Sequence, residues 1–264
     1  MDVWHITLAA RNRGTLLPRE ASRREGVRRL AQLAGEEMLL FSIVHDHVHV
    51  VLAGDRARVG AVAAGMHKTL RPLVRVALAA ARIRAVAGRS HLWWLVRYVL
   101  GQPQHHGIDA HPALWTGSCL PDLIGARRVS GLQLRIREHL PELQWVALAR
   151  CVDLSSDRLM PASPEQMRAA GVAMLTRCAT SALAADPSLA GNSPLLVRTR
   201  KVVACLASES GFHPRDVAWA LGVTLRGERR LRAAAVDEAD LIAVRVRLAL
   251  ELVAASRPTS VAVA

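Results

Sequence analysis

The order of apolar and polar residues predicts a mixed α/β region at the start of the chain. Val3 to Ala10 and, more strongly, Met38 to Ala53 are rich in β-branched residues with rough alternation, which predicts strands. Ser22 to Leu33 lies between them and has apolar residues at helical spacing. Arg58 to Val86 is alanine-rich and predicts one or two helices, and His91 to Gly101 predicts another.

The second part of the chain has only helical patterns. Ser163 and Pro164 are typical of an N-cap and a first helical residue, and predict a helix that continues to about Ala185. Further helices are predicted at Leu195–Ser208, Pro214–Leu221, Thr224–Ala234 and Asp237–Ala255, after a turn-rich connector at 186–194. The tail Ser256–Ala264 is expected to fray. We therefore expect an α+β domain over residues 1–150 and an all-α domain over residues 155–264.

The composition shows that the chain is strongly basic. The chain has 264 residues, 51% of them hydrophobic, and a formal net charge of +13, which excludes a disordered basic tail. Of its 35 basic residues, only Lys68 and Lys201 are lysines. Guanidinium groups suit bidentate contacts with phosphate, but arginine excess follows equally well from the base composition of a gene. The charge therefore favours a polyanionic partner without identifying it.

Several classes of protein are excluded by what the sequence lacks. Its four cysteines have neither CxxC nor zinc-finger spacing, so we expect reduced and mostly buried thiols. The first residues do not resemble a secretory signal, and charged residues interrupt every long apolar run. These features predict a soluble, cytoplasmic protein with no membrane partner.

Three histidines alternate in the strong strand pattern FSIVHDHVHVVLAG. His45, His47 and His49 are two residues apart, and alternate side chains of a strand point to the same face. Imidazoles on one face can share a divalent ion. The other interpretation is that they are exposed polar positions of a half-buried strand; the repetition favours the metal site.

Tyr98 is the only tyrosine of the chain. A tyrosine in the apolar run HLWWLVRYVLGQP ordinarily fills the core or its boundary. Gln102 lies four residues later, on the same face if the helix continues to it. The phenol then points at a bound phosphate while the amide oxygen binds a metal. Spacing alone leaves both interpretations open.

Taken in order, these motifs resemble the single-tyrosine HUH transposases of the IS200-like type, and most of all the REP-associated tyrosine transposases. VHDHVHVVL resembles the family run MPNHVHLLL, and RYVLGQP at Arg97–Pro103 resembles RYIHxNP. WHITLAARNRG resembles the first strand of the family, and Trp115–Ser118 loosely resembles a W-S-S segment. The resemblance covers about residues 1–130 and implies a ferredoxin-like HUH nuclease domain with an antiparallel sheet.

The resemblance also implies a site. His47 and His49 are expected to bind Mg²⁺ or Mn²⁺, with Gln102 as the third ligand. Tyr98 is expected to attack single-stranded or hairpin DNA, which leaves a 5′-phosphotyrosine link and a free 3′-OH. Metal neutralisation of the phosphate suits a phenol that is protonated at neutral pH.

The chain departs from the family pattern in two places. His45 and Asp46 replace the usual Pro-Asn, and His45 is then an extra ligand, a phosphate contact or neither; we favour neither. Residues 87–94 compress a segment that in relatives often contains a further strand, which questions the completeness of the sheet.

Near the end of the chain, HPRDVAWALGVTLRGERRL resembles a helix-turn-helix with Gly222 at the turn. Its second helix is expected to present four arginines to DNA: Arg226, Arg229, Arg230 and Arg232. Glu228 stands where a buried aliphatic residue is expected. The competing interpretation is a plain helical bundle with a solvated arginine face.

These features favour a metal-dependent DNA strand transferase of the transposase type. One alternative is a catalytically inactive, transposase-derived regulator that binds DNA sequence-specifically. Another is a hydrolase that uses the histidines and water and does not need Tyr98. The sequence does not choose between a monomer and a homodimer.

Overall fold

A computed structural model describes residues 2–152, 154 and 159–255 of the chain. It divides into two compact units, one formed by Met1–Ile124 with Arg128–Arg158 and the other by Gly125–Arg127 with Leu159–Ala264. The tail expected to fray, 256–264, lies outside the described residues. None of the described helices is both long enough and apolar enough to cross a membrane.

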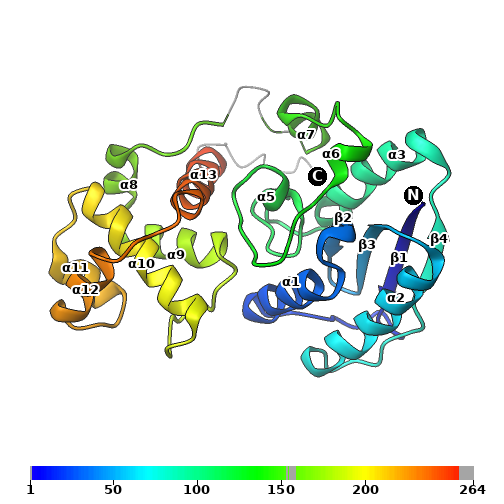
Figure 1. Cartoon of the computed structure of the whole chain (residues 1–264), viewed down its shortest axis with the longest axis horizontal. Helices are drawn as coiled ribbons and strands as arrows, with labels where there is room; N and C mark the ends of the chain where they lie inside the picture. Colours follow the sequence, from blue (N-terminus) through cyan, green and yellow to red (C-terminus); the bar gives the residue numbers. More distant parts are fainter. Residues whose placement is uncertain (1, 153, 155–158, 256–264) are drawn as a thin grey trace, which may run out of the picture. The chain divides into compact units, whose positions relative to one another are not determined.

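The first unit is built on a four-stranded sheet with the order β2-β3-β1-β4 (Figure 1). The strands are β1 (Val3–Ala9), β2 (Met38–Ile43), β3 (His47–Ala53) and β4 (Arg82–Ala85). Each neighbouring pair is antiparallel. Helix α1 (Glu20–Ala34) with the 3₁₀ turn η1 (Gly35–Glu37) connects β1 to β2, and α2 (Arg56–Leu70) with η2 (Arg71–Leu73) precedes β4. A mixed α/β unit with an antiparallel sheet is therefore present, as predicted.

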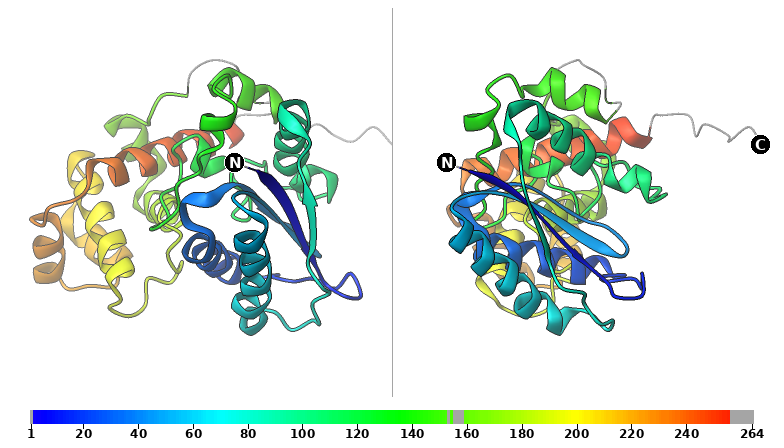
Figure 2. Two further views of the ribbon diagram at one scale, coloured as in Figure 1. Left: turned by 45° about the vertical axis from the view of Figure 1, so that its right-hand side comes forward. Right: turned by 90° about the vertical axis from the view of Figure 1, so that its right-hand side faces the viewer.

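The two faces of the sheet are covered by different helices (Figure 2). Helices α1 and α2 lie together on the face of Val48 and Val50, which are fully buried. Gly26 permits this packing, because a Cβ there would lie 2.9 Å from Leu17 Cδ1 and 3.4 Å from Ile43 Cδ1. Helix α3 (Gly88–Leu100) lies on the other face, towards which alternate residues of β3 point.

Three predictions for this unit are wrong. Met38 to Ala53 is a hairpin rather than one strand, because the chain reverses at 44–46 between β2 and β3. His45 lies exposed in that turn, so it does not share a strand face with His47. The predicted helices of Arg58 to Val86 end at Leu73, and the chain then forms the edge strand β4. The fourth strand of the sheet lies directly before residues 87–94, the segment that is compressed relative to the family pattern.

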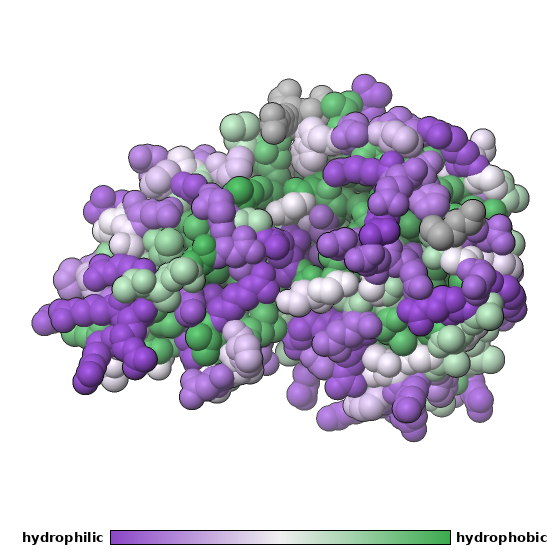
Figure 3. All heavy atoms as spheres, in the orientation of Figure 1, coloured by the Kyte–Doolittle hydropathy of each residue, from purple (hydrophilic) through white to green (hydrophobic). Residues whose placement is uncertain are grey.

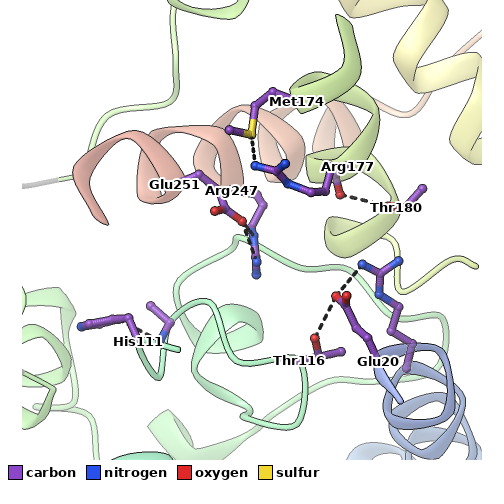
Figure 4. A network of polar contacts seen from close by, with 10 residues as sticks. Glu20, His111, Thr116, Met174, Arg177, Thr180, Arg247 and Glu251 are labelled. Carbon is purple, nitrogen blue, oxygen red and sulfur yellow. Dashed lines mark hydrogen bonds and ion pairs between the residues drawn. The ribbon is translucent and has the colours of Figure 1, made fainter. Parts of the chain in front are cut away.

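A loop after α3 is attached to the sheet and to α1. Trp115 Nε1 donates to the Ile43 carbonyl at 2.8 Å, and Thr116 Oγ1 donates to Glu20 Oε1 at 3.1 Å (Figure 4). Gly117 packs directly on the same strand, since a Cβ there would lie 2.2 Å from Ile43 O. Four short helices belong to this part of the unit: α4 (Gln102–His105), α5 (Leu120–Leu123), α6 (Ile136–His139) and α7 (Trp145–Cys151).

The described part of the second unit has helices and no strands. They are α8 (Pro164–Ala170), α9 (Val172–Ala182), α10 (Pro194–Glu209), α11 (Pro214–Ala220), α12 (Leu225–Arg232) and α13 (Glu238–Ala255). Ser163 caps α8 as predicted, with a capping box completed by Gln166. The single helix expected to reach Ala185 is interrupted at Gly171, whose φ of 85° does not continue a helix.

Ionic contacts support the packing of these helices around an apolar core. Arg198 on α10 binds Asp240 of α13 through two nitrogens, each 2.6 Å from a carboxylate oxygen, and Asp240 is only 1% exposed. Within α13, Arg247 donates to Glu251 at 2.9 Å (Figure 4). None of the four cysteines, all of which are described, forms a disulfide, and Cys119 and Cys178 are buried.

Candidate metal site and tyrosine

Strand β3 places two of the predicted ligands side by side. His47 and His49 are alternate residues and therefore project from the same face, and their Nε2 atoms are 2.6 Å apart. His49 is buried, 2% exposed, and lies at the centre of the sheet, where it is opposite Thr7 of β1 and Ser42 of β2. The two imidazoles thus meet at a fixed point of the scaffold.

Gln102 reaches the same point from the end of α3. Gly101 ends that helix and Gln102 begins α4, so the side chain is not on a continuous helix with Tyr98. Its Nε2 donates to the Tyr98 carbonyl at 3.3 Å, and this contact turns its Oε1 towards His47 Nε2 at 3.1 Å. Gln102 is 1% exposed. The structure therefore brings His47, His49 and Gln102 together.

The other ring nitrogens of both histidines have partners of their own. His47 Nδ1 lies 2.7 Å from Asp46 Oδ1, and a carboxylate there accepts a proton from Nδ1. His49 Nδ1 lies 2.9 Å from His5 Nε2 and 3.4 Å from Thr7 Oγ1. Contacts of this kind fix the orientation and tautomer of a ligand histidine. With Nδ1 protonated on both rings, the Nε2 lone pairs would point into the space that the two rings share with Gln102.

Electrostatics favour neutral imidazoles at this position. Burial, followed by the proximity of His47 and His5, lowers the pKa of His49 to about 2. Burial, followed by Arg84 and His91, lowers the pKa of His5 to about 4. Burial is the largest single influence on Asp46 and opposes its charge, but the hydrogen bond from His47, the electrostatic effects of His47 and His106 and a backbone hydrogen bond together outweigh it and lower the pKa of that carboxyl. A neutral imidazole is the form in which His49 can bind a metal.

The three converging donors suit one small divalent cation. Imidazole nitrogens bind first-row divalent metals, and an amide oxygen is a type of ligand that Mg²⁺ and Mn²⁺ accept. Octahedral ligands at about 2.1 Å from an ion lie about 3 Å from one another. The separations of 2.6 Å and 3.1 Å between the donor atoms are near this value. The spacing of the donor atoms is therefore compatible with a single divalent ion.

Tyr98 lies directly beside this cluster. Its ring packs edge-on against His49 with ring centroids 5.2 Å apart, and Trp94 stacks on it at 4.8 Å with an interplanar angle of 11°. The tyrosine is half-buried, and its hydroxyl hydrogen-bonds to no atom of the described residues. Tyr98 is thus held by its ring, while its phenolic oxygen is available.

Three residues around the site had no interpretation from the sequence. His5 and Asp46 contact the predicted ligands, and His106 Nδ1 lies 3.8 Å from Asp46 Oδ1. Asp46, His47 and His106 also form a group whose possible metal-binding atoms lie within 4.8 Å of one another. The position of Asp46 within HDHVH was an available signal. His45 faces elsewhere, with its ring edge-on to Trp115 at 6.4 Å.

The four predicted DNA-binding arginines gather on one helix of the second unit. Arg226, Arg229, Arg230 and Arg232 are all exposed on α12, and Figure 3 shows hydrophilic side chains over the α11–α12 end. Gly222 has φ 62° in the turn between the helices, and the Thr224 side chain caps α12. Glu228 is buried, with Oε1 3.7 Å from Arg232, so the expected aliphatic position holds a carboxylate.

Comparisons with known proteins add one remote structural similarity to this geometry. No family model matches the sequence, and no curated protein matches it. Among solved structures, the chain is similar to a REP-associated tyrosine transposase bound to a REP hairpin. The identity is 18%, the TM-score is 0.35, and the match covers 45% of this chain and 76% of that chain. A similarity at this level assigns neither a family nor a function to the chain.

Proposed function

We propose that this chain is a metal-dependent DNA strand transferase that forms a 5′-phosphotyrosine intermediate through Tyr98. The observation that carries the proposal is the placement of that tyrosine against His49, whose Nε2 meets His47 Nε2 at 2.6 Å beside the amide of Gln102. A phosphate bound to a cation that these three residues hold would lie beside the Tyr98 ring.

The cation is proposed to be Mg²⁺ or Mn²⁺, held by His47, His49 and Gln102. When bound, it would neutralise a phosphodiester and orient it. Asp46 and His5 keep the two imidazoles in the ligand tautomer through their contacts of 2.7 Å and 2.9 Å. Trp94 and His49 restrict the Tyr98 ring from two sides, so the nucleophile is oriented before DNA binds.

The proposed reaction consists of two transesterification steps that run in opposite directions. In the first, the Tyr98 oxygen bonds to phosphorus, the bond from phosphorus to the 3′ oxygen breaks, and the proton lost by the phenol balances the one gained by the 3′-OH. In the second, a 3′-OH attacks the phosphotyrosine and restores the phenol. The covalent link conserves the energy of the broken bond, so strands can be joined without a further energy source.

We also propose a structural assignment for each unit. The order of elements β1-α1-β2-β3-α2-β4, with strand order β2-β3-β1-β4, suits a ferredoxin-like HUH domain. In the second unit, α11 and α12 with their glycine turn suit a helix-turn-helix that binds DNA. Hairpin or single-stranded DNA is the proposed partner.

The proposal is tested by incubating the protein with labelled hairpin DNA and Mn²⁺ and analysing the product under denaturing conditions. A strand transferase gives a covalent protein–DNA adduct that runs more slowly than free DNA. DNA binding without any adduct or cleavage would overturn the proposal in favour of the inactive regulator.

Asp46 is expected to support metal binding without being a ligand of the proposed ion. Replacing Asp46 with Ala removes the acceptor for His47 Nδ1, and we expect the Kd for Mn²⁺ to rise about 10- to 100-fold. Free Mn²⁺ measured by electron paramagnetic resonance checks this. The matched control is His45→Ala, one residue away in the same turn, which should keep the wild-type Kd. Equal affinities in both variants would contradict the role of Asp46.

The arginines of α12 are expected to contribute most of their binding energy through phosphates. Replacing Arg229 and Arg230 with Ala should weaken duplex binding and reduce the slope of log K against log salt by about 1.8. Arg168→Ala with Arg177→Ala removes the same charge from exposed sites on α8 and α9 and should leave the slope near the wild-type value. An unchanged slope in the first double variant would favour a solvated arginine face.

A further inference from the structure

The sheet face that carries the candidate site is covered over only part of its width. Helix α3 contacts β2, and His49 on β3 is 2% exposed beneath it. On the neighbouring strand β1, His5 and Thr7 point to the same face and are only half-buried. Solvent access on this face therefore increases from β3 towards the β4 edge.

Strand β4 adds two positive charges to the exposed part of this face. Arg82 is opposite Thr7 and Arg84 is opposite His5, so both arginines share the face of the site. Both are exposed, and neither side chain forms an ion pair or hydrogen bond with any residue that the structure describes. Arg84 is also close enough to His5 to act on it electrostatically, after burial the largest influence on that imidazole. A phosphate can bind these guanidinium groups without breaking an existing pair.

An aromatic side chain borders the same area. Trp94 is 56% exposed although it stacks on Tyr98, one helical turn further along α3. A nucleobase presents a flat π-face of suitable size for stacking on an exposed indole. The indole thus extends the aromatic surface of the tyrosine towards solvent.

We infer that a single DNA strand lies across the open half-face, defined as His5, Thr7, Arg82, Arg84 and Trp94. Phosphates bind Arg82 and Arg84, and one base stacks on Trp94, which directs the backbone towards Tyr98. The inference rests on the proposed function, since it names the path of that substrate. A single strand is required because the bases of a duplex are stacked on one another and do not offer a free face to an indole.

The binding test separates this inference from the chemistry. It uses the full chain with Tyr98→Phe, in EDTA, and follows a fluorescein-labelled oligothymidylate by anisotropy. Replacing Arg82 and Arg84 with Ala should weaken binding about tenfold and reduce the slope of log K against log salt by about 1.4. The matched control is Lys68→Ala with Arg71→Ala, which removes the same charge from the end of α2 on the opposite side of the sheet.

Two variants of the indole test the stacking contact. Trp94→Ala should weaken oligothymidylate binding about tenfold, while Trp94→Phe keeps most of the affinity because a flat ring remains. Binding of a duplex of the same length should not respond to Trp94→Ala.

The inference is overturned if the Arg82 and Arg84 double variant loses no more affinity than the control pair. In that case the arginines protect the β4 edge from pairing with other strands. Failure of the proposed chemistry gives a different result, namely no adduct with Mn²⁺ while both effects on strand binding persist.

Discussion

Replacing Tyr98 with Phe is expected to abolish the covalent protein–DNA adduct completely. Phenylalanine keeps the ring that packs at 5.2 Å from His49 and 4.8 Å from Trp94, so the surroundings of the site are retained. Only the oxygen that attacks phosphorus is lost. Removing a catalytic nucleophile costs on the order of 10⁶ in turnover in a well-studied hydrolase, and the chain has no second tyrosine to replace it. A denaturing gel with labelled hairpin DNA and Mn²⁺ measures the adduct.

The control for this variant is the affinity for the metal. Because Tyr98 is not a proposed ligand, the Kd for Mn²⁺ and the midpoint of thermal unfolding should match those of the wild-type protein. DNA cleavage that persists in Tyr98→Phe without an adduct would contradict the transferase and point to a hydrolase that activates water. Loss of both metal binding and adduct would indicate a structural role for the hydroxyl.

Local sequence patterns predicted the faces of the central strands but not the chain reversal between them. Alternation around Val48 and Val50 is a property of neighbouring residues, so it placed His47 and His49 on one face correctly. The apolar run continues through Val44 into the turn, and no glycine or proline marks the reversal at 44–46. The hairpin depends on pairing between β2 and β3, which a single-strand pattern does not specify.

The edge strand β4 was missed for a related reason. Its sequence RIRA follows an alanine-rich helix, and only Ile83 of its four residues is not exposed. An edge strand pairs with one neighbour and has little apolar alternation to distinguish it from a helix. Its pairing with β1 is a long-range interaction, and the same pairing brings Arg82 and Arg84 to the site face.

In the candidate site, too, the sequence indicated some of the contacts, whereas others depend on the folded sheet. The spacing of Tyr98 and Gln102 indicated proximity, although the chain leaves α3 at Gly101 and the contact depends on the start of α4. His5 is 44 residues from His49 in sequence, and a lone histidine in a strand carries no distinguishing pattern. Its position beside His49 follows from the β1–β3 register, which only the folded sheet provides.

The second large effect is expected at His47. Replacing His47 with Ala removes the imidazole whose Nε2 faces both His49 Nε2 at 2.6 Å and Gln102 Oε1 at 3.1 Å. Removing a residue that only hydrogen-bonds to a metal ligand already lowers the affinity for the metal about 10- to 100-fold. Removing a ligand itself should therefore raise the Kd for Mn²⁺ by more than about 100-fold. Adduct formation should fall below detection at Mn²⁺ concentrations that saturate the wild-type protein.

His47 suits this test better than His49, because its side chain is 15% exposed at the start of β3, whereas truncation of the buried His49 leaves a cavity in the sheet. The matched control is His67→Ala, an exposed histidine of α2 outside the site, which should change neither the Kd nor the adduct yield. Thermal unfolding in EDTA separates loss of the ligand from loss of the fold, since the metal-free variants should unfold at similar temperatures. If the His47 and His67 variants bind Mn²⁺ equally, the ion does not bind at the β3 histidines. Adduct formation by such a variant would then have to depend on another group, of which Asp46 and His106 are the nearest.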